Sequence, residues 1–291
     1  MNLTFRAAIL GACLLISAPL FAQETEEPAT PDIVVTGKRP SKEQLRDFVR
    51  ALTPAPPSGS IPRFIDQICP FVTGLAPIQN ERIETRLRQV ASAVGLDVAK
   101  RGCAPNAFVV VTKDKRAFID ALAEKQPDAF GMLSMRQVRQ LARSKGPAAA
   151  WQLAGPVDSS GTPLRFDEAM GAYVNDTTQA ASRLRSPSQI GFDASILVVE
   201  SGALEGLTAT QLADYAAMRL LARLDPARLP PDAPATILKI LEAPMGTPLP
   251  ITMTTWDAGL LRGVYSASRD LNAQSQRSQI ARKVNEELDK R

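Results

Sequence analysis

Residues 190–200 read Ile-Gly-Phe-Asp-Ala-Ser-Ile-Leu-Val-Val-Glu, and a second apolar run, Asn-Ala-Phe-Val-Val-Val-Thr, occupies residues 106–112. Both runs are short and rich in β-branched side chains, which is typical of strands that are buried on both faces. Strands of this kind need other elements packed against them to exclude water. The two runs therefore predict the centre of a buried sheet.

Helical patterns lie between these strands and after them. Apolar residues recur at helical spacing in several segments, and Ser or Thr followed three residues later by Gln or Asp marks some of the starts. The predicted starts are Pro77, Ser134, Thr208 and Thr254 or Thr255. Weaker strand signals occur at 151–157 and 164–174. Together these patterns predict an α+β fold, with a mixed sheet packed with several helices.

The chain divides by composition into a leader, a linker and one domain. Residues 23–60 are rich in Pro, Ser and Thr and are expected to form a disordered linker, although Ser41 with Gln44 could cap a short helix within it. A single α+β domain is predicted for residues 61–291. Apolar spacing fades near the end of the chain, so we expect the C-terminal helix to be frayed after residue 272.

The first 22 residues resemble a cleavable signal peptide. Residues 2–6 form a short region with one basic side chain, residues 7–20 are apolar, and cleavage is predicted between Ala22 and Gln23. An uncleaved anchor and a lipoprotein site at Cys13 are the alternatives, but the apolar stretch is short for a membrane span. The mature chain is expected to be periplasmic or secreted and to contain no transmembrane segment.

Cleavage would leave two cysteines, Cys69 and Cys103. In an oxidising compartment an isolated pair most simply forms one disulfide. A reactive thiol or a two-cysteine metal site are the alternatives. A metal would need carboxylates beside both thiolates, and the sequence places no acidic cluster near them.

The complete absence of histidine limits the chemistry of this chain. It excludes Ser-His-Asp and Cys-His catalysis and imidazole metal sites, so no metal and no cofactor are predicted. The chain has 34 Lys+Arg against 30 Asp+Glu and 5% aromatic residues, with the two signs of charge interspersed. This pattern does not indicate a nucleic-acid partner.

Acidic residues are the remaining candidates for general acid and base chemistry. Glu200, Glu205 and Asp214 lie around the end of the second strand and in the helix that follows it. Such carboxylates could line one groove, and a pair about 5–10 Å apart could act on a glycoside. The alternative is that they are ordinary surface charges, since Glu205 lies just before a helix N-terminus, where negative charge is favourable.

Residues 32–39, Asp-Ile-Val-Val-Thr-Gly-Lys-Arg, resemble the segment that opens the plug of TonB-dependent outer-membrane receptors. The many alternating strands of a barrel do not follow in the sequence. The resemblance implies an envelope setting in a Gram-negative bacterium, with β-addition to a partner's sheet as a further possibility. The alternative is an extended tail without a function of its own.

The order of predicted elements over residues 77–266 is similar to that of the upper subdomain of zincin metalloproteases, and residues 254–265 resemble the helix that closes many zincin domains. That family carries His-Glu-x-x-His on the helix after the last strand. Here residues 211–218 read Gln-Leu-Ala-Asp-Tyr-Ala-Ala-Met, so both zinc-binding imidazoles are missing. The resemblance implies a degenerate, non-catalytic zincin-like domain, and no catalytic residue carries over.

The sequence thus favours an exported, periplasmic binding protein without catalytic activity. Its partner would be an envelope protein or a peptide, held in the former substrate groove with the strand Ile196–Glu200 as the available edge. A histidine-free hydrolase that uses carboxylates, such as a glycosidase, is one alternative. A purely structural envelope component, with a large exposed apolar patch, is another.

Overall fold

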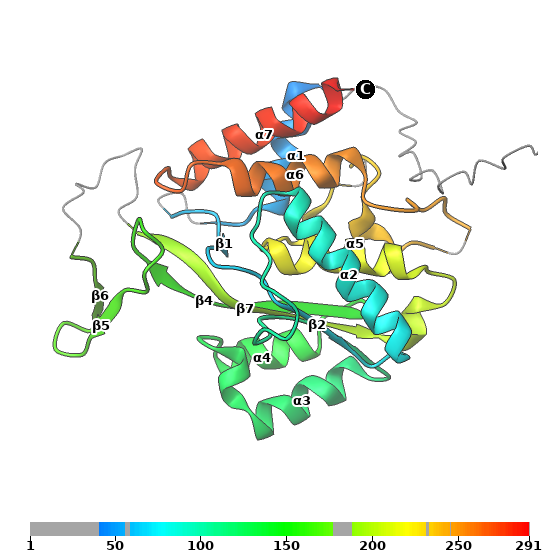
Figure 1. Cartoon of the computed structure of the whole chain (residues 1–291), viewed down its shortest axis with the longest axis horizontal. Coiled ribbons are helices and arrows are strands. Elements are labelled where there is room, and N and C mark those ends of the chain that lie inside the picture. Colours follow the sequence, from blue (N-terminus) through cyan, green and yellow to red (C-terminus); the bar gives the residue numbers. More distant parts are fainter. Residues whose placement is uncertain (1–40, 56–58, 177–187, 231–232, 245, 291) are drawn as a thin grey trace, which may run out of the picture. The chain divides into compact units, whose positions relative to one another are not determined.

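The computed structural model describes residues 41–55, 59–176, 188–230, 233–244 and 246–290, all within the compact unit Ile33–Arg291. The predicted signal peptide, residues 1–22, and the segment 32–39 lie outside the described residues. Figure 1 shows a central sheet with helices on both faces. The α+β fold with a mixed sheet is therefore confirmed.

Strand β7 (Gln189–Glu200) is the centre of the sheet. Its C-terminal half pairs in parallel with β3 (Ala107–Thr112) on one side, and β4 (Ala148–Val157) pairs antiparallel along the other side. The two apolar runs of the sequence are thus neighbouring strands. The prediction that Ile196–Glu200 offers a free edge is wrong, because the strand is hydrogen-bonded on both sides.

The remaining strands complete the sheet and form a separate hairpin. Strand β2 (Pro70–Thr73) lies outside β3 and parallel to it, while the two residues of β1 (Arg63–Phe64) pair with the N-terminal part of β7. Strands β5 (Arg165–Asp167) and β6 (Ala172–Val174) form an antiparallel pair of their own. Every strand pair of the five-stranded sheet is parallel except the pair of β4 with β7.

Alternation along the strands separates two cores. Leu197 and Val199 of β7 face one core, where α2 (Pro77–Ala93) and α5 (Ala209–Leu221) pack against the sheet. Because successive side chains of a strand point to opposite faces, Ile196 and Val198 face the other core. The predicted helix starts at Pro77 and Thr208 are confirmed.

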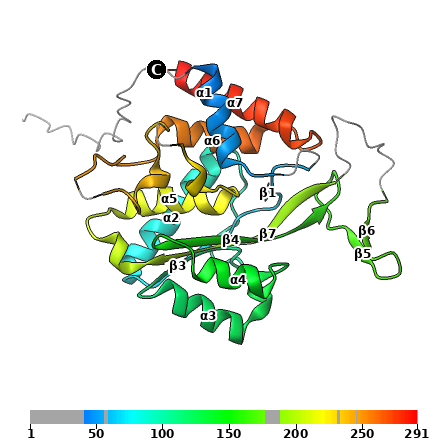
Figure 2. The same ribbon diagram turned by 180° about the vertical axis from the view of Figure 1, so that it is seen from behind.

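The second core is smaller and lies under two helices, α3 (Lys115–Lys125) and α4 (Met135–Ala142). Both views show these helices on the opposite side of the sheet from α5, α6 and α7 (Figures 1 and 2). Trp151 of β4 stacks on Phe130 with ring centroids 5.1 Å apart, and its indole N–H donates to the carbonyl of Ala129. Short 3-10 helices connect the larger elements at Pro127–Phe130, Ser201–Leu204, Pro226–Arg228 and Ile237–Lys239.

Helix α1 (Lys42–Leu52) lies inside the segment that the sequence predicted as a linker. Ser41 and Gln44 form the expected capping box. The helix buries Phe48 among its apolar residues, and that ring contacts Trp256 edge-on with centroids 5.1 Å apart. The ordered core thus begins before residue 61, because this helix contributes its apolar face to the larger core.

The C-terminal segment is a packed helix, so the expectation of fraying after residue 272 is wrong. Helix α6 (Thr255–Ser266) ends before α7 (Ala273–Asp289) begins, and the two helices pack along their lengths. Gly259 and Gly263 make the close approach possible. A Cβ atom at either glycine would lie 2.9 Å from a backbone Cα of α7. Small residues at one face thus fix this helix pair.

Substituting Gly263→Ala should destabilise the fold. The new methyl group would meet Ile280 and force the helices apart, which typically costs about 1–3 kcal/mol, partly offset by about 1 kcal/mol from the better helix propensity of alanine. Gly202→Ala is the matched control, since its Cβ would meet nothing within 4 Å. Urea unfolding of both variants measures the difference, and equal stability of the two would contradict the packing described.

Candidate functional site

Asp214 is a structural anchor between α5 and its neighbours. Its side chain is fully buried, and its carboxylate accepts hydrogen bonds from Arg86 Nε at 2.8 Å and from Nη2 at 3.2 Å. The Thr252 hydroxyl and the Met253 amide donate to the same carboxylate at 2.6 and 2.7 Å. A carboxylate without exposed surface and with both oxygens occupied cannot reach a substrate.

The other two candidate groove carboxylates have different surroundings. Glu200, at the end of β7, accepts from the backbone amide of Lys115 at 3.2 Å and so holds the start of α3. Glu205 is exposed at the end of the 3-10 helix after β7. No contact joins Glu200, Glu205 and Asp214 in the part of the chain that the structure describes. The geometry offers no support for a catalytic acid pair among them.

Asp257 has a structural role, as the acidic residue of the capping box that begins α6. It is completely buried at the start of α6 and accepts from the backbone amide and the hydroxyl of Thr254. Thr236 and the amide of Ile237 also donate to it. Burial raises the pKa of this carboxyl above its ordinary value, and the hydrogen bonds oppose that shift. The residue ties α6 to the preceding 3-10 helix.

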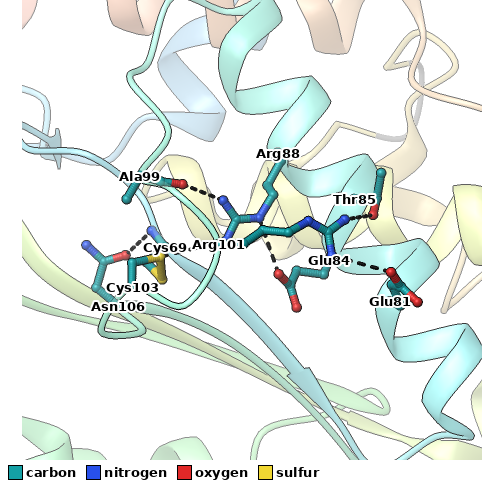
Figure 3. A network of polar contacts seen from close by, with 9 residues as sticks. All are labelled: Cys69, Glu81, Glu84, Thr85, Arg88, Ala99, Arg101, Cys103 and Asn106. Carbon is teal, nitrogen blue, oxygen red and sulfur yellow. Dashed lines mark hydrogen bonds and ion pairs between the residues drawn. A yellow bond between two sulfur atoms is a disulfide. The ribbon is translucent and has the colours of Figure 1, made fainter.

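Cys69 and Cys103 form the predicted disulfide, with Cα atoms 6.1 Å apart and a separation of 34 positions in sequence. The bond joins the start of β2 to the loop before β3 (Figure 3). Asn106 reinforces this corner, because its side-chain oxygen accepts from the amide of Cys69 at 2.7 Å. The alternatives of a free thiol and a two-cysteine metal site do not apply to a bonded pair.

Two arginines connect the disulfide-linked loop to α2 (Figure 3). Arg88 donates to Glu84 within the helix and to the carbonyl of Ala99 at 2.6 Å, and its Nη2 lies 3.7 Å from Cys103 Sγ. Arg101 reaches back to α2, where it contacts Glu81 and Thr85 at 3.4 and 3.2 Å. These bonds serve the fold, since each cation has its partners within the network.

Removing the disulfide should lower stability by about 3–4 kcal/mol, the loss of loop-closure constraint expected for a loop of this length. The double variant Cys69→Ala and Cys103→Ala tests this by chemical unfolding. Reduced wild-type protein is the control, because it should match the double variant. A loss below about 1 kcal/mol would show that the arginine contacts alone hold the loop.

The outer edge of β4 carries backbone groups that pair with no other strand among the described residues. The amide of Glu200 donates to the carbonyl of Pro147 at 2.8 Å. Residues of antiparallel strands alternate between bonded and non-bonded pairs, so every second residue after Pro147 directs its N–H and C=O away from β7. The outward-facing residues are Ala148, Ala150 and Gln152.

This edge lies between a helix on each face of the sheet, with α5 on one side and α4 on the other (Figure 2). The side chains of Ala148 and Ala150 pack toward the core that contains α5, while Ala149 and Trp151 belong to the core under α4. Small side chains thus line the α5 side of the edge. Ala148, Ala150 and Gln152, which face this side, are partly exposed.

Gln152 joins the edge to two arginines of α5 and the residues after it. Its amide nitrogen donates to the carbonyl of Arg219 at 3.2 Å, and its side-chain oxygen accepts from Arg223 Nε at 3.3 Å. Arg223 also lies over the ring of Phe192, 5.8 Å from its centroid. Burial lowers the pKa of Arg223, so the cation lies in a partly desolvated place.

Arg219 stacks on the helix residue four positions before it. Its Nη1 donates to the Tyr215 hydroxyl at 2.6 Å, and the guanidinium carbon lies 5.6 Å from that ring's centroid. The buried Nε of Arg219 has no hydrogen-bond partner. Tyr215 and Gln211 occupy the positions at which the zincin resemblance would require imidazoles, and Gln211 is bonded to Thr208 and Pro250.

Sequence reasoning missed this edge and its arginines. Arg219 and Arg223 were not among the candidates, although their spacing from Tyr215 repeats every four residues. That spacing places Tyr215 and Arg219 on one face of α5, whereas Arg223 follows the end of the helix at Leu221. Only the pairing of β4 shows what these side chains meet. Among the described residues no group of three potential metal ligands occurs, and no helix has the length and hydropathy of a membrane span.

Asp214→Asn should lower the free energy of unfolding by about 3 kcal/mol. The change leaves the Arg86 guanidinium without its carboxylate and turns an amide donor toward groups that already donate. Glu205→Gln is the control, since exposed substitutions usually stay within about 0.5 kcal/mol. Thermal and urea unfolding measure both. Similar stability of the two variants would contradict the anchoring role of Asp214.

No protein-family model matches this chain. No curated protein and no solved structure matches it significantly either.

Proposed function

We propose that this chain is a non-catalytic binding protein of the bacterial envelope that holds an extended peptide as an added strand beside β4. The observation that carries the proposal is the outer row of N–H and C=O groups at Ala148, Ala150 and Gln152, which no other described strand takes up. A peptide that adds to a sheet edge gains affinity from such main-chain groups and specificity from alternate side chains.

The shape of the edge limits what it can hold. The pairing of β4 with β7 shifts register between Leu153 and Ala154, and Pro156 follows soon after. Bulges and prolines interrupt strand pairing and protect an edge from uncontrolled association. The regular part is therefore short and suits a segment of a few residues, as expected for a peptide rather than for another whole sheet.

The absence of histidine and the buried state of Asp214 support a role without catalysis. The zincin resemblance adds to this proposal in one respect. The element order on which it rests is present, with α2, β3, β4 and β7 preceding α5. A degenerate domain of that kind would retain a peptide groove after losing its zinc ligands.

An exported location is part of the proposal. The first 22 residues carry the pattern of a signal peptide, and the Cys69–Cys103 disulfide suits an oxidising compartment. The peptide partner would then come from an envelope protein.

The substitution Ala150→Pro tests the use of the edge. Proline removes one outward N–H and adds bulk on the outer side, while the N–H groups that pair with β7 belong to the alternate residues. Peptides are first selected on the full chain from a library of randomised heptapeptides with blocked ends. Their affinities, measured by fluorescence polarisation, should fall about tenfold or more in the variant, because main-chain hydrogen bonds are lost.

Ala150→Val is the matched control, since it keeps the N–H and should bind within about twofold of wild type. Ala148→Pro provides a second block of the same edge. Circular dichroism shows that each variant remains folded. If the library yields no binding peptide, or if the selected peptides bind both proline variants as tightly as wild type, the edge is not the binding site.

A further inference from the structure

The outer face of α4 carries a row of arginines. Residues 129–157 contain no Asp or Glu, whereas Arg136, Arg139 and Arg143 follow one another at spacings of three and four. All three side chains are exposed, while Val138 on the opposite face belongs to the smaller core. Residues three and four positions apart are neighbours on a helix surface. The three cations therefore form one continuous arginine stripe along α4 and its C-cap residue.

Acidic side chains of the neighbouring elements do not pair with this stripe. Helix α3 packs beside α4, and its Asp120 is paired with Arg116 of the same helix at 3.7 Å. Among the described residues no carboxylate forms an ion pair with any arginine of the stripe. Like charges three or four residues apart destabilise a helix. No ion pair within the described chain offsets this repulsion.

The helix dipole accounts for two of the arginines but not for the third. A cation is favoured at the C-terminal end of a helix, where Arg139 and Arg143 lie, and is disfavoured in the first turn. Arg136 is the second residue of α4, directly after Met135. Its charge lies where the helix already carries partial positive charge. An anionic ligand at the stripe would offset this effect and the repulsion between the arginines.

Two exposed methionines adjoin the stripe at the start of α4. Met132 is 83% exposed and precedes the N-cap residue Ser134, and Met135 is 52% exposed. Met135 lies four positions before Arg139, so the two are neighbours on the helix surface. Cations beside apolar side chains are typical of segments that lie at a membrane surface. A nucleic acid or a polyacidic chain would engage the arginines only.

We propose that the outer face of α4 docks this chain onto a bilayer that contains anionic phospholipids. The guanidinium groups of the arginine stripe bind the lipid phosphates, which match their planar arrangement of donors. Met132 and Met135 enter the boundary between headgroups and acyl chains. The inference goes beyond the proposed peptide binding and does not depend on it, because it uses α4 rather than the outer edge of β4.

Vesicle sedimentation measures this docking. The predicted signal peptide would bind a bilayer by itself, so the experiment uses residues 23–291, which include every residue of both cores. Vesicles of phosphatidylcholine alone are compared with vesicles of phosphatidylcholine and phosphatidylglycerol in equal parts. The chain should bind the anionic vesicles about tenfold or more tightly, and less so as salt is added. Arg136→Gln should weaken this binding about fivefold, the contribution expected of one basic residue near an anionic surface.

Two triple variants separate the stripe from the overall charge of the chain. Replacing all three arginines of the stripe by Gln should abolish the preference for anionic vesicles. The matched control loses the same charge from α1, α2 and the 3-10 helix after α5, through Arg50→Gln, Arg82→Gln and Arg228→Gln at exposed positions. It should stay within about threefold of the parent chain. Circular dichroism shows that both remain folded.

The methionines are tested apart from the charges. Met132→Ser combined with Met135→Ser should weaken binding to the anionic vesicles about threefold, because less apolar surface leaves water. Binding as tight as that of the parent chain would overturn the entry of these side chains into the bilayer.

The remaining outcomes decide whether a membrane is the partner. Equal binding of neutral and anionic vesicles, or an equal loss in the two triple variants, overturns the docking surface. Duplex DNA and polyglutamate are measured alongside the vesicles. Tighter binding to either polymer than to anionic vesicles, lost in the stripe variant, assigns the arginines to that kind of partner and overturns the membrane proposal. None of these results bears on the β4 edge, whose peptide binding is measured separately.

Discussion

The double pairing of β7 is the constraint on which the rest of this structure depends. Because β3 and β4 take up both of its edges, every backbone group in its C-terminal half is used within the sheet. Alternation then sends Leu197 into the larger core and Val198 into the smaller one. One strand thus fixes the position of helices on both faces. It also leaves β4, the antiparallel strand, at one edge of the sheet.

The larger core is completed by segments from the two ends of the described chain. Arg63, at β1, is buried and donates to the carbonyls of Val264 and Ala267, where α6 ends. Desolvation lowers the pKa of this arginine to about 10, with a further lowering by Arg269. A cation at a helix C-terminus satisfies carbonyls that have no partner in the helix. The sheet and the helix pair α6–α7 are therefore joined by a buried polar contact as well as by apolar packing.

Local patterns in the sequence were sufficient for the main elements but not for their pairing. The apolar runs of β3 and β7, the capping boxes at Ser41 and Thr208 and the cysteine pair were all predicted from nearby residues. The edge position was predicted wrongly, because strand neighbours are set by contacts between distant segments. Helix α7 was missed because its buried face includes polar side chains. Gln276 accepts from the amide of Ile61, and Glu287 pairs with Arg262 and Lys290, so apolar spacing alone could not reveal that face.

Helix α5 serves the fold and also borders the edge of β4 that we propose as a binding site. Asp214 is directed toward Arg86 of α2, and the Thr252 hydroxyl, from the segment before α6, donates to the same carboxylate, so this contact joins α5 to both segments. The backbone carbonyl of Arg219 accepts from Gln152 of β4, while the side-chain Nε of Arg219 has no partner. A buried donor without a partner costs free energy, and only a ligand or water at that place can recover it. The acidic residue that seemed suited to chemistry is thus structural, whereas Arg219, which the sequence did not single out, keeps a buried Nε without a hydrogen-bond partner.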